Sequence, residues 1–171
     1  LLNHPSTEHA RDEIVDSVPY PGEPMLLVDL SGTFCAAGKN SDNSRFNVLS
    51  AVVSLAMALD AEDDSGCGVA VIAPYAAQVR LIRAMLQDYR ARKLQTDVSC
   101  ATVHQFQGSE RDVVIIDAVE SFPAKSLGIL TSNNENGSLD RLVNVAATRA
   151  RGKLVTVASG RFWDVQTRES R

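Results

Sequence analysis

Residues 69–83 have the sequence VAVIAPYAAQVRLIR, which joins an apolar run, a proline and an amphipathic segment. The run Val69–Ala73 is apolar at every position, which is typical of a strand that is buried on both faces, and Pro74 ends it. From Ala76 to Arg92, apolar side chains recur at helical spacing, at positions 79, 82 and 86. The stretch therefore predicts a buried strand followed by a helix with one solvent-exposed, basic face.

Strands and helices alternate on both sides of this stretch. The apolar runs predict further strands at Met25–Leu30, Val98–Val103, Val113–Val119 and Leu154–Ala158, and helices at Asn47–Leu59 and Leu139–Ala150. Strands that are apolar on both faces and alternate with helices predict a three-layer α/β domain with a mainly parallel sheet. In such sheets ligands bind beyond the carboxyl ends of the strands, so we expect the functional residues just after strands.

The length of 171 residues fits one domain, and 44% hydrophobic residues are enough to form a core. Residues 1–24 are polar, contain four prolines and show no sustained period, which indicates an arm or linker. We expect the domain proper to occupy residues 25–160 and a basic tail to occupy residues 161–171.

Several function classes are disfavoured by composition. No apolar run approaches the length of a membrane span and Leu1–Pro5 does not resemble a signal peptide, so a cytoplasmic protein is expected. The three cysteines are scattered, which favours reduced thiols over disulfides or a metal site. The net charge of −4 argues against coating nucleic acid by bulk charge. Residues 141–171, however, have a net charge of +5. This positive charge could contact phosphate, or it could belong to a solvated tail.

Two segments resemble phosphate-binding motifs but lack a required residue. Gly32–Asn40, GTFCAAGKN, has its glycines one residue too far apart for a P-loop, and Asn40 replaces the hydroxyl that would hold magnesium. Val113–Asp117, VVIID, resembles a Walker B strand, but Ala118 follows where a catalytic glutamate is usual. We interpret Asp117 as the cap of a buried strand.

Three other segments hold residues suited to phosphate chemistry: Val71–Arg83, Ala101–Asp117 and Asp140–Ala158. In the second, Gly108 permits a tight turn or a close approach of the backbone to a ligand. In the third, Arg149 lies near the predicted end of a helix, where its guanidinium could reach beyond the domain edge. Such a group can stabilise the charge that develops on a transferring phosphoryl group.

These segments resemble motifs IV, V and VI of superfamily 1 helicases, in the same order. FQGSE before an apolar strand, followed by NVAATRAR about 35 residues later, is the most specific part. The chain is most similar to superfamily 1B enzymes of the nonsense-mediated-decay helicase type and their bacterial relatives, over about residues 26–160. The resemblance implies a RecA-like fold.

The resemblance also implies roles for five residues near the nucleotide. Arg149 corresponds to the motif VI arginine finger, which contacts the γ-phosphate of ATP bound to the partner domain. Glu110 corresponds to the motif V glutamate, and Gly108 with Gln107 would shape that loop. Arg151 would brace the site through an ion pair.

A second group is implied to face nucleic acid. Thr102 and His104 match positions that face the strand backbone, although His104 replaces an acidic residue of some members. Gln78 and Arg80 occupy motif IV positions. The resemblance does not decide whether these two residues contact the nucleotide or the nucleic-acid strand. Tyr75 could stack on a base or pack against the neighbouring helix.

The implied function is the second motor domain of an ATP-dependent DNA or RNA helicase. ATP and Mg²⁺ would be held mainly by a preceding RecA-like domain, the partner would be single-stranded DNA or RNA, and this chain alone would be inactive. A RecA-like interaction module without catalysis is an alternative, which the presence of both Glu110 and Arg149 disfavours. A small ATPase that uses GTFCAAGKN is a weaker alternative.

Overall fold

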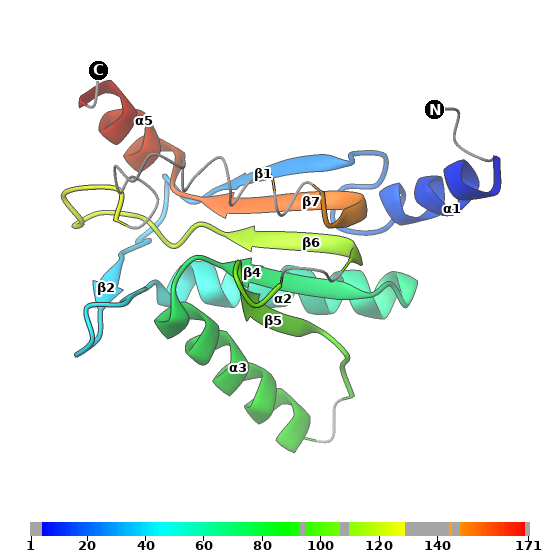
Figure 1. Ribbon diagram of the computed structural model, residues 1–171, viewed down its shortest axis with the longest axis horizontal. Coiled ribbons are helices and arrows are strands. Elements are labelled where there is room, and N and C mark those ends of the chain that lie inside the picture. The colour runs from blue at the N-terminus through cyan, green and yellow to red at the C-terminus, as the bar shows by residue number, and fades with distance from the viewer. Residues whose placement is uncertain (1–4, 93–94, 107–109, 129–143, 145–147, 170–171) are drawn as a thin grey trace.

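The computed structural model describes residues 5–92, 95–106, 110–128, 144 and 148–169. Its centre is a five-stranded sheet in the order β1-β7-β6-β4-β5 (Figure 1). The strands are β1 (Met25–Asp29), β4 (Val69–Ala73), β5 (Ser99–Thr102), β6 (Arg111–Asp117) and β7 (Ala150–Ala158). Every neighbouring pair is parallel, which confirms the predicted α/β class.

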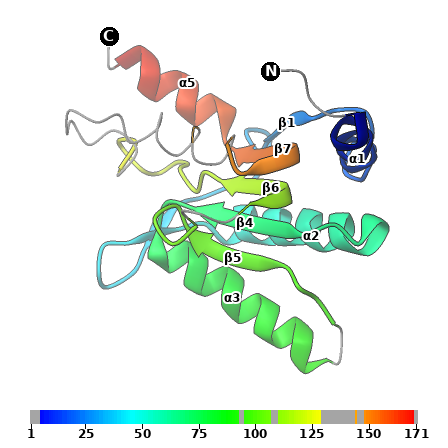
Figure 2. The same cartoon turned by 45° about the vertical axis from the view of Figure 1, so that its right-hand side comes forward.

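Helices α2 (Val48–Ser65) and α3 (Ala76–Ala91) cover one face of the sheet (Figures 1 and 2). Asn47 caps α2, because its Oδ1 accepts a hydrogen bond from the backbone N–H of Ser50, and Gly66 ends the helix in a left-handed conformation. The core on this face joins both helices to alternate residues of the strands, among them Ala51, Leu55, Ile82, Val71, Ile115 and Val155. Both helices lie where the sequence predicts them.

The opposite face of the central strands is also covered. Ala70, Ile72, Val114 and Ile116 pack there against Val103, Phe106 and Trp163. Trp163 belongs to helix α5 (Gly160–Glu169), which occupies the segment expected to be a basic tail and anchors it through the fully buried Phe162. The interior strands are therefore buried on both faces, as their continuous apolar runs predict.

The prediction of a buried strand was wrong for β1. Met25 and Leu27 are 69% and 65% exposed. The physical reason is that β1 lies at the edge of the sheet, where among the described strands it pairs with β7 alone. The last strand also starts earlier than predicted, at Ala150, and most of the helix expected before it lies outside the described residues.

The near-P-loop segment forms a hairpin. Strand β2 (Gly38–Lys39) pairs in antiparallel register with β3 (Arg45–Phe46), at the carboxyl end of the main sheet (Figure 1). The glycine and lysine therefore lie in a strand, and the next helix begins only at Val48. This backbone differs from a P-loop, in which a helix starts directly after the glycine and lysine.

Residues 5–24 contain helix α1 (Pro5–Val15), which lies beside the start of β7 (Figure 1). The buried ammonium of Lys153 in β7 donates hydrogen bonds to the backbone carbonyls of Ser17 and Pro19, which lie in the turn after α1. Gly152 leaves room for Ile14, since a Cβ added at Gly152 would lie 2.5 Å from the Ile14 Cγ2. The amino-terminal segment is thus packed onto the domain. Within the described part of the chain, no helix combines the length and apolarity needed to cross a bilayer.

Candidate functional site

Four charged residues gather where β6 and β7 begin, and we call Glu110, Asp112, Arg149 and Arg151 the edge cluster. The backbone N–H of Arg111 donates to the Arg149 carbonyl at 3.0 Å, which holds the two strand entrances side by side. Arg151 pairs with Glu110 at 3.3 Å and with Asp112 at 3.6 Å. The β6–β7 pairing therefore fixes the positions of all four residues.

Arg149 differs from Arg151 in its bonding. Its Nε is buried and has no hydrogen-bond partner among the residues that the structure describes. A guanidinium N–H without a partner is costly to bury, so this donor suits an acceptor supplied from outside the chain. A phosphate oxygen is an acceptor of that kind.

The edge cluster lies at the amino ends of β6 and β7, whereas the functional residues were expected at the carboxyl ends of the strands. The sequence analysis placed the functional residues after strands, whereas Glu110 and Arg149 directly precede β6 and β7. The reason is the length of the segment after β5, which crosses the sheet face from the end of one parallel strand to the start of the next. Gln107 and Gly108 belong to that segment and lie outside the described residues.

Thr102 and His104 lie at the carboxyl end of β5. Thr102 ends the strand, its carbonyl accepts a hydrogen bond of 3.0 Å from the N–H of Phe106, and its own N–H donates to Gln105 Oε1 at 3.4 Å. The turn formed by these bonds leaves His104 exposed. His104 is therefore accessible at the carboxyl end of the sheet, and Thr102 is partly exposed beside it.

Arg80 is separated from the edge cluster. It lies early in α3, and its exposed side chain is 3.7 Å from the Asp42 carboxylate of the β2–β3 hairpin. Because α3 begins at the carboxyl end of β4, Arg80 is at the same end of the sheet as Thr102 and His104. The structure therefore does not bring Arg80 together with Arg149, although the resemblance allowed Arg80 a contact with the nucleotide.

Tyr75 and Gln78, which were candidates for nucleic-acid contact, are buried instead. Gln78 is fully buried, its Oε1 accepts from the Asn47 N–H at 2.8 Å and its Nε2 donates to Asp117 at 2.5 Å. Tyr75 is 2% exposed, and its hydroxyl donates to Glu120. A buried ring has no free face on which a base could stack, so both residues have structural roles in this domain.

Asp117 forms the other half of the Gln78 contact. It is fully buried at the end of β6 and accepts a second hydrogen bond, of 3.0 Å, from the Val119 N–H. Burial raises the pKa of this carboxyl to about 6, and the hydrogen bonds from its neighbours oppose that effect. These contacts agree with the interpretation of Asp117 as a strand cap.

Sequence reasoning missed a buried charged pair, between Arg45 and Glu120. Arg45 also donates to the Ser126 carbonyl at 2.7 Å, and Glu120 accepts from Tyr75 as well. Glu120 follows an apolar strand and Arg45 stands in the polar segment SDNSRFN. No spacing connects the two in sequence, so only the fold reveals the pair.

A five-stranded parallel sheet with helices packed on it defines a RecA-like α/β domain. The family model described as "AAA domain" matches residues 1–161, and the chain belongs to this family. Its relatives are helicases of superfamily 1, as the three motifs indicate. A curated relative is the DNA polymerase alpha-associated DNA helicase A of Saccharomyces cerevisiae, 38% identical over 53% of this chain and 12% of that protein.

Two other curated proteins are also similar to this chain. The DNA-binding protein SMUBP-2 of Mesocricetus auratus is 30% identical over 81% of this chain and 13% of that protein. The Regulator of nonsense transcripts 1 homolog of Arabidopsis thaliana is 33% identical over 53% of this chain and 7% of that protein. The chain thus spans 13% or less of the length of these relatives.

A solved structure of the C-terminal domain of a possible DNA helicase from Lactobacillus plantarum is also similar. It is 20% identical, with a TM-score of 0.41 over 92% of this chain and 86% of that one.

Proposed function

We propose that this chain is the second motor domain of an ATP-dependent superfamily 1 helicase acting on single-stranded DNA or RNA. The observation on which this rests is the edge cluster, where Arg149 lies beside the Glu110–Arg151 pair and its buried Nε has no partner among the described residues. Arg149 would act as the arginine finger on a nucleotide that a preceding RecA-like domain holds.

The chemistry follows from the guanidinium. ATP with Mg²⁺, held mainly by the preceding domain, supplies the phosphoryl group that is transferred to water. Arg149 would place a fixed positive charge against that group, and such a finger contributes about 10³- to 10⁵-fold in rate. Arg151 and Glu110 would orient the neighbouring backbone, because their ion pair joins the entrances of the two strands.

The position of helix α1 supports this arrangement. It packs beside the start of β7, at the same end of the sheet as Arg149. A preceding domain that is connected through residues 1–24 would therefore face the edge cluster. Closure of the two domains on ATP and their opening after hydrolysis would then move one domain along the strand relative to the other.

The opposite end of the sheet would contribute to the nucleic-acid track. Thr102 and His104 lie there, and a strand held mainly through its phosphates would be bound with little sequence preference. The two ends give one domain two functions, with the nucleotide sensed at the amino ends of the strands and nucleic acid followed at the carboxyl ends.

The test is steady-state ATPase activity of the chain joined to its native upstream sequence, with and without single-stranded DNA or RNA. We expect stimulation by nucleic acid and loss of most of the turnover in Arg149→Ala, with partial recovery at best in Arg149→Lys because an ammonium lacks the fork geometry. The chain alone should hydrolyse ATP negligibly. Arg92→Ala is a matched control, since Arg92 is exposed at the end of α3.

Circular dichroism would show that each variant stays folded. If Arg149→Ala has the activity of the Arg92→Ala control, Arg149 is not a finger. A non-catalytic RecA-like interaction module would then describe the chain better.

A further inference from the structure

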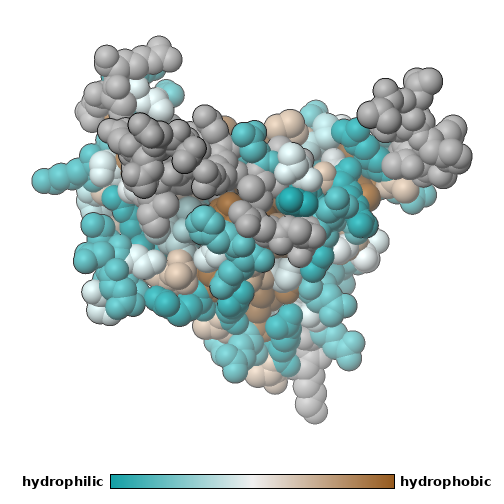
Figure 3. Space-filling view, in the orientation of Figure 1, coloured by the Kyte–Doolittle hydropathy of each residue, from teal (hydrophilic) through white to brown (hydrophobic). Residues whose placement is uncertain are grey.

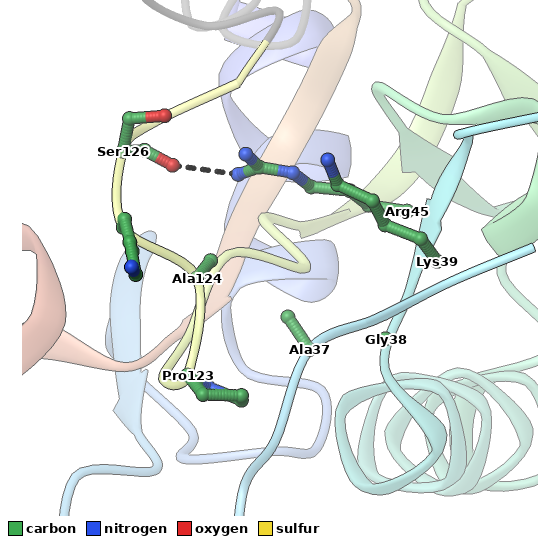
Figure 4. Close-up of a pocket in the computed structure, with 8 residues that line it drawn as sticks. Ala37, Gly38, Lys39, Arg45, Pro123, Ala124 and Ser126 are labelled. Atoms are coloured by element: carbon green, nitrogen blue, oxygen red, sulfur yellow. Dashed lines mark hydrogen bonds between the residues drawn. The ribbon is translucent and has the colours of Figure 1, made fainter.

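A pocket opens at the carboxyl end of the sheet, away from the edge cluster. Its volume is about 360 Å³, and it lies between the β2–β3 hairpin and the loop that follows β6. The lining includes Lys39 and Arg45 from the hairpin and Lys125 and Ser126 from the loop. Figure 4 shows Lys39 and Arg45 side by side, both directed from the hairpin toward the loop with Ser126.

The pocket is positively charged. Lys39 and Lys125 are exposed, and among the described residues neither ammonium group has an ion-pair partner. Glu120 neutralises Arg45 in the floor, so the two lysines remain as uncompensated charge at the mouth. Figure 3 shows mostly hydrophilic side chains over the hairpin, which agrees with a ligand that is itself polar.

The two walls are held together before any ligand binds. The Ser121 hydroxyl donates to the Cys35 carbonyl at 2.6 Å, and the Ala37 N–H donates to the Phe122 carbonyl at 3.1 Å. Arg45 adds a third tie through its bond of 2.7 Å to the Ser126 carbonyl. A rigid pocket loses little entropy when a ligand binds, so its shape can be selective.

We propose that this pocket binds backbone phosphate of the single strand, which makes Lys39 and Lys125 part of the nucleic-acid track. The inference rests on the proposed function. Lysine ammonium groups act as point charges for phosphate, and an open, polar mouth suits a passing strand better than an enclosed small molecule.

The position of the pocket supports a strand as the ligand. Thr102 and His104 follow β5, whereas the pocket lies between the loop after β6 and the β2–β3 hairpin, which contacts the start of α3 through the Arg80–Asp42 pair. Strand β4 separates β5 from β6, so a spacing of about 4.8 Å per strand puts β5 and β6 about 10 Å apart. A strand that runs along the carboxyl ends would contact His104 and then reach the pocket within a few nucleotides.

The test is fluorescence-anisotropy binding of a labelled oligothymidylate, and of the matching oligouridylate, to the 171-residue chain over a range of salt concentrations. We compare Lys39→Gln/Lys125→Gln with Arg92→Gln/Arg168→Gln, which removes the same charge from exposed helical positions. We expect roughly tenfold weaker binding and a shallower salt slope, by about 0.7 per lost phosphate contact, in the lysine variant only. Circular dichroism checks that both variants fold.

Each other outcome overturns the proposal. Equal affinity of the two double variants shows that general charge, not the pocket, attracts the strand. No measurable binding by the unaltered chain removes the pocket from the track. Calorimetry with inorganic pyrophosphate separates the two sources of phosphate. If the lysine variant loses the heat of pyrophosphate binding but keeps its affinity for the oligonucleotide, the pocket is a small-molecule site. The ATPase test of Arg149 is independent of these results, so either idea can fail alone.

Discussion

Arg45 and Glu120 form a buried ion pair between residues that are 75 positions apart in sequence. Their side chains are 9% and 0% exposed, and the Tyr75 hydroxyl completes the contacts of the glutamate. The pair joins the β2–β3 hairpin to the loop after β6. It therefore fixes both walls of the pocket that Lys39 and Lys125 line.

Breaking this pair should destabilise the protein strongly. Arg45→Met leaves Glu120 as a buried charge without its cation, which typically costs about 3–5 kcal/mol of unfolding free energy. Arg45→Met/Glu120→Leu removes both charges and should be more stable than Arg45→Met. Urea unfolding of the two variants measures the difference. The pair is not structurally important if Arg45→Met loses less than about 1 kcal/mol.

The raised pKa of Asp117 predicts a pH dependence of stability. Burial raises its pKa from 3.8 to about 6 in the folded protein. Because the folded state then holds the proton more tightly, Asp117 stabilises the fold below about pH 4 and this contribution is lost as the pH rises through about 6. One pKa unit is worth about 1.4 kcal/mol, so the whole effect is on the order of 3 kcal/mol.

Asp117→Asn removes this titration. The unfolding free energy of the unaltered protein relative to Asp117→Asn should fall between about pH 4 and about pH 7, as measured by denaturant titrations at several pH values. Other carboxyl groups are common to both proteins and cancel in the difference. A difference that is independent of pH would contradict the burial of an ionisable Asp117.

Gly152 should be intolerant of any side chain while Ile14 is present. A Cβ at position 152 would lie 2.5 Å from Ile14 Cγ2, so Gly152→Ala pushes α1 off the start of β7 at a cost of about 1–3 kcal/mol. Limited proteolysis should then cut within residues 5–24 faster than in the unaltered protein. In Gly152→Ala/Ile14→Ala the clash is removed, and the cutting rate should match that of Ile14→Ala alone. No rescue would show that the glycine serves another purpose.

Arg83 and Arg90 should protect the edge of the sheet at β5. Arg83 Nε donates to the Cys100 carbonyl at 2.9 Å, and Arg90 donates to the carbonyls of Thr96 and Val98. Cys100 belongs to the edge strand β5, and Thr96 and Val98 lie in the segment directly before it. The free carbonyls of an edge strand can pair with another chain. Arg83→Ala/Arg90→Ala should therefore self-associate more readily in sedimentation velocity.

The control for the edge is Arg92→Ala, which removes a nearby exposed arginine at the end of the same helix. Equal self-association of this control would show that net charge, rather than capping of the carbonyls, limits association of the chain.

Local pattern alone determined the elements at the centre of this protein. The uninterrupted apolar run Val69–Ala73 and the helical spacing that follows it predicted β4 and α3, and the apolar VVIID run predicted β6, because burial on one or two faces leaves a direct record in the sequence. The order of the FQGSE and TRAR segments similarly predicted the helicase family, which the family match together with the helicase relatives confirms.

Only the tertiary structure decided which of these elements are neighbours. Periodicity shows that a residue faces inward, but not which residue it meets, so the burial of Gln78 against Asp117 and of Arg45 against Glu120 could not be predicted. The same holds for β1, whose apolar sequence resembles that of an interior strand although it lies at an edge. Strand order is set by packing between segments far apart in the chain, and this packing placed Arg149 and the lysine pocket at opposite ends of the sheet.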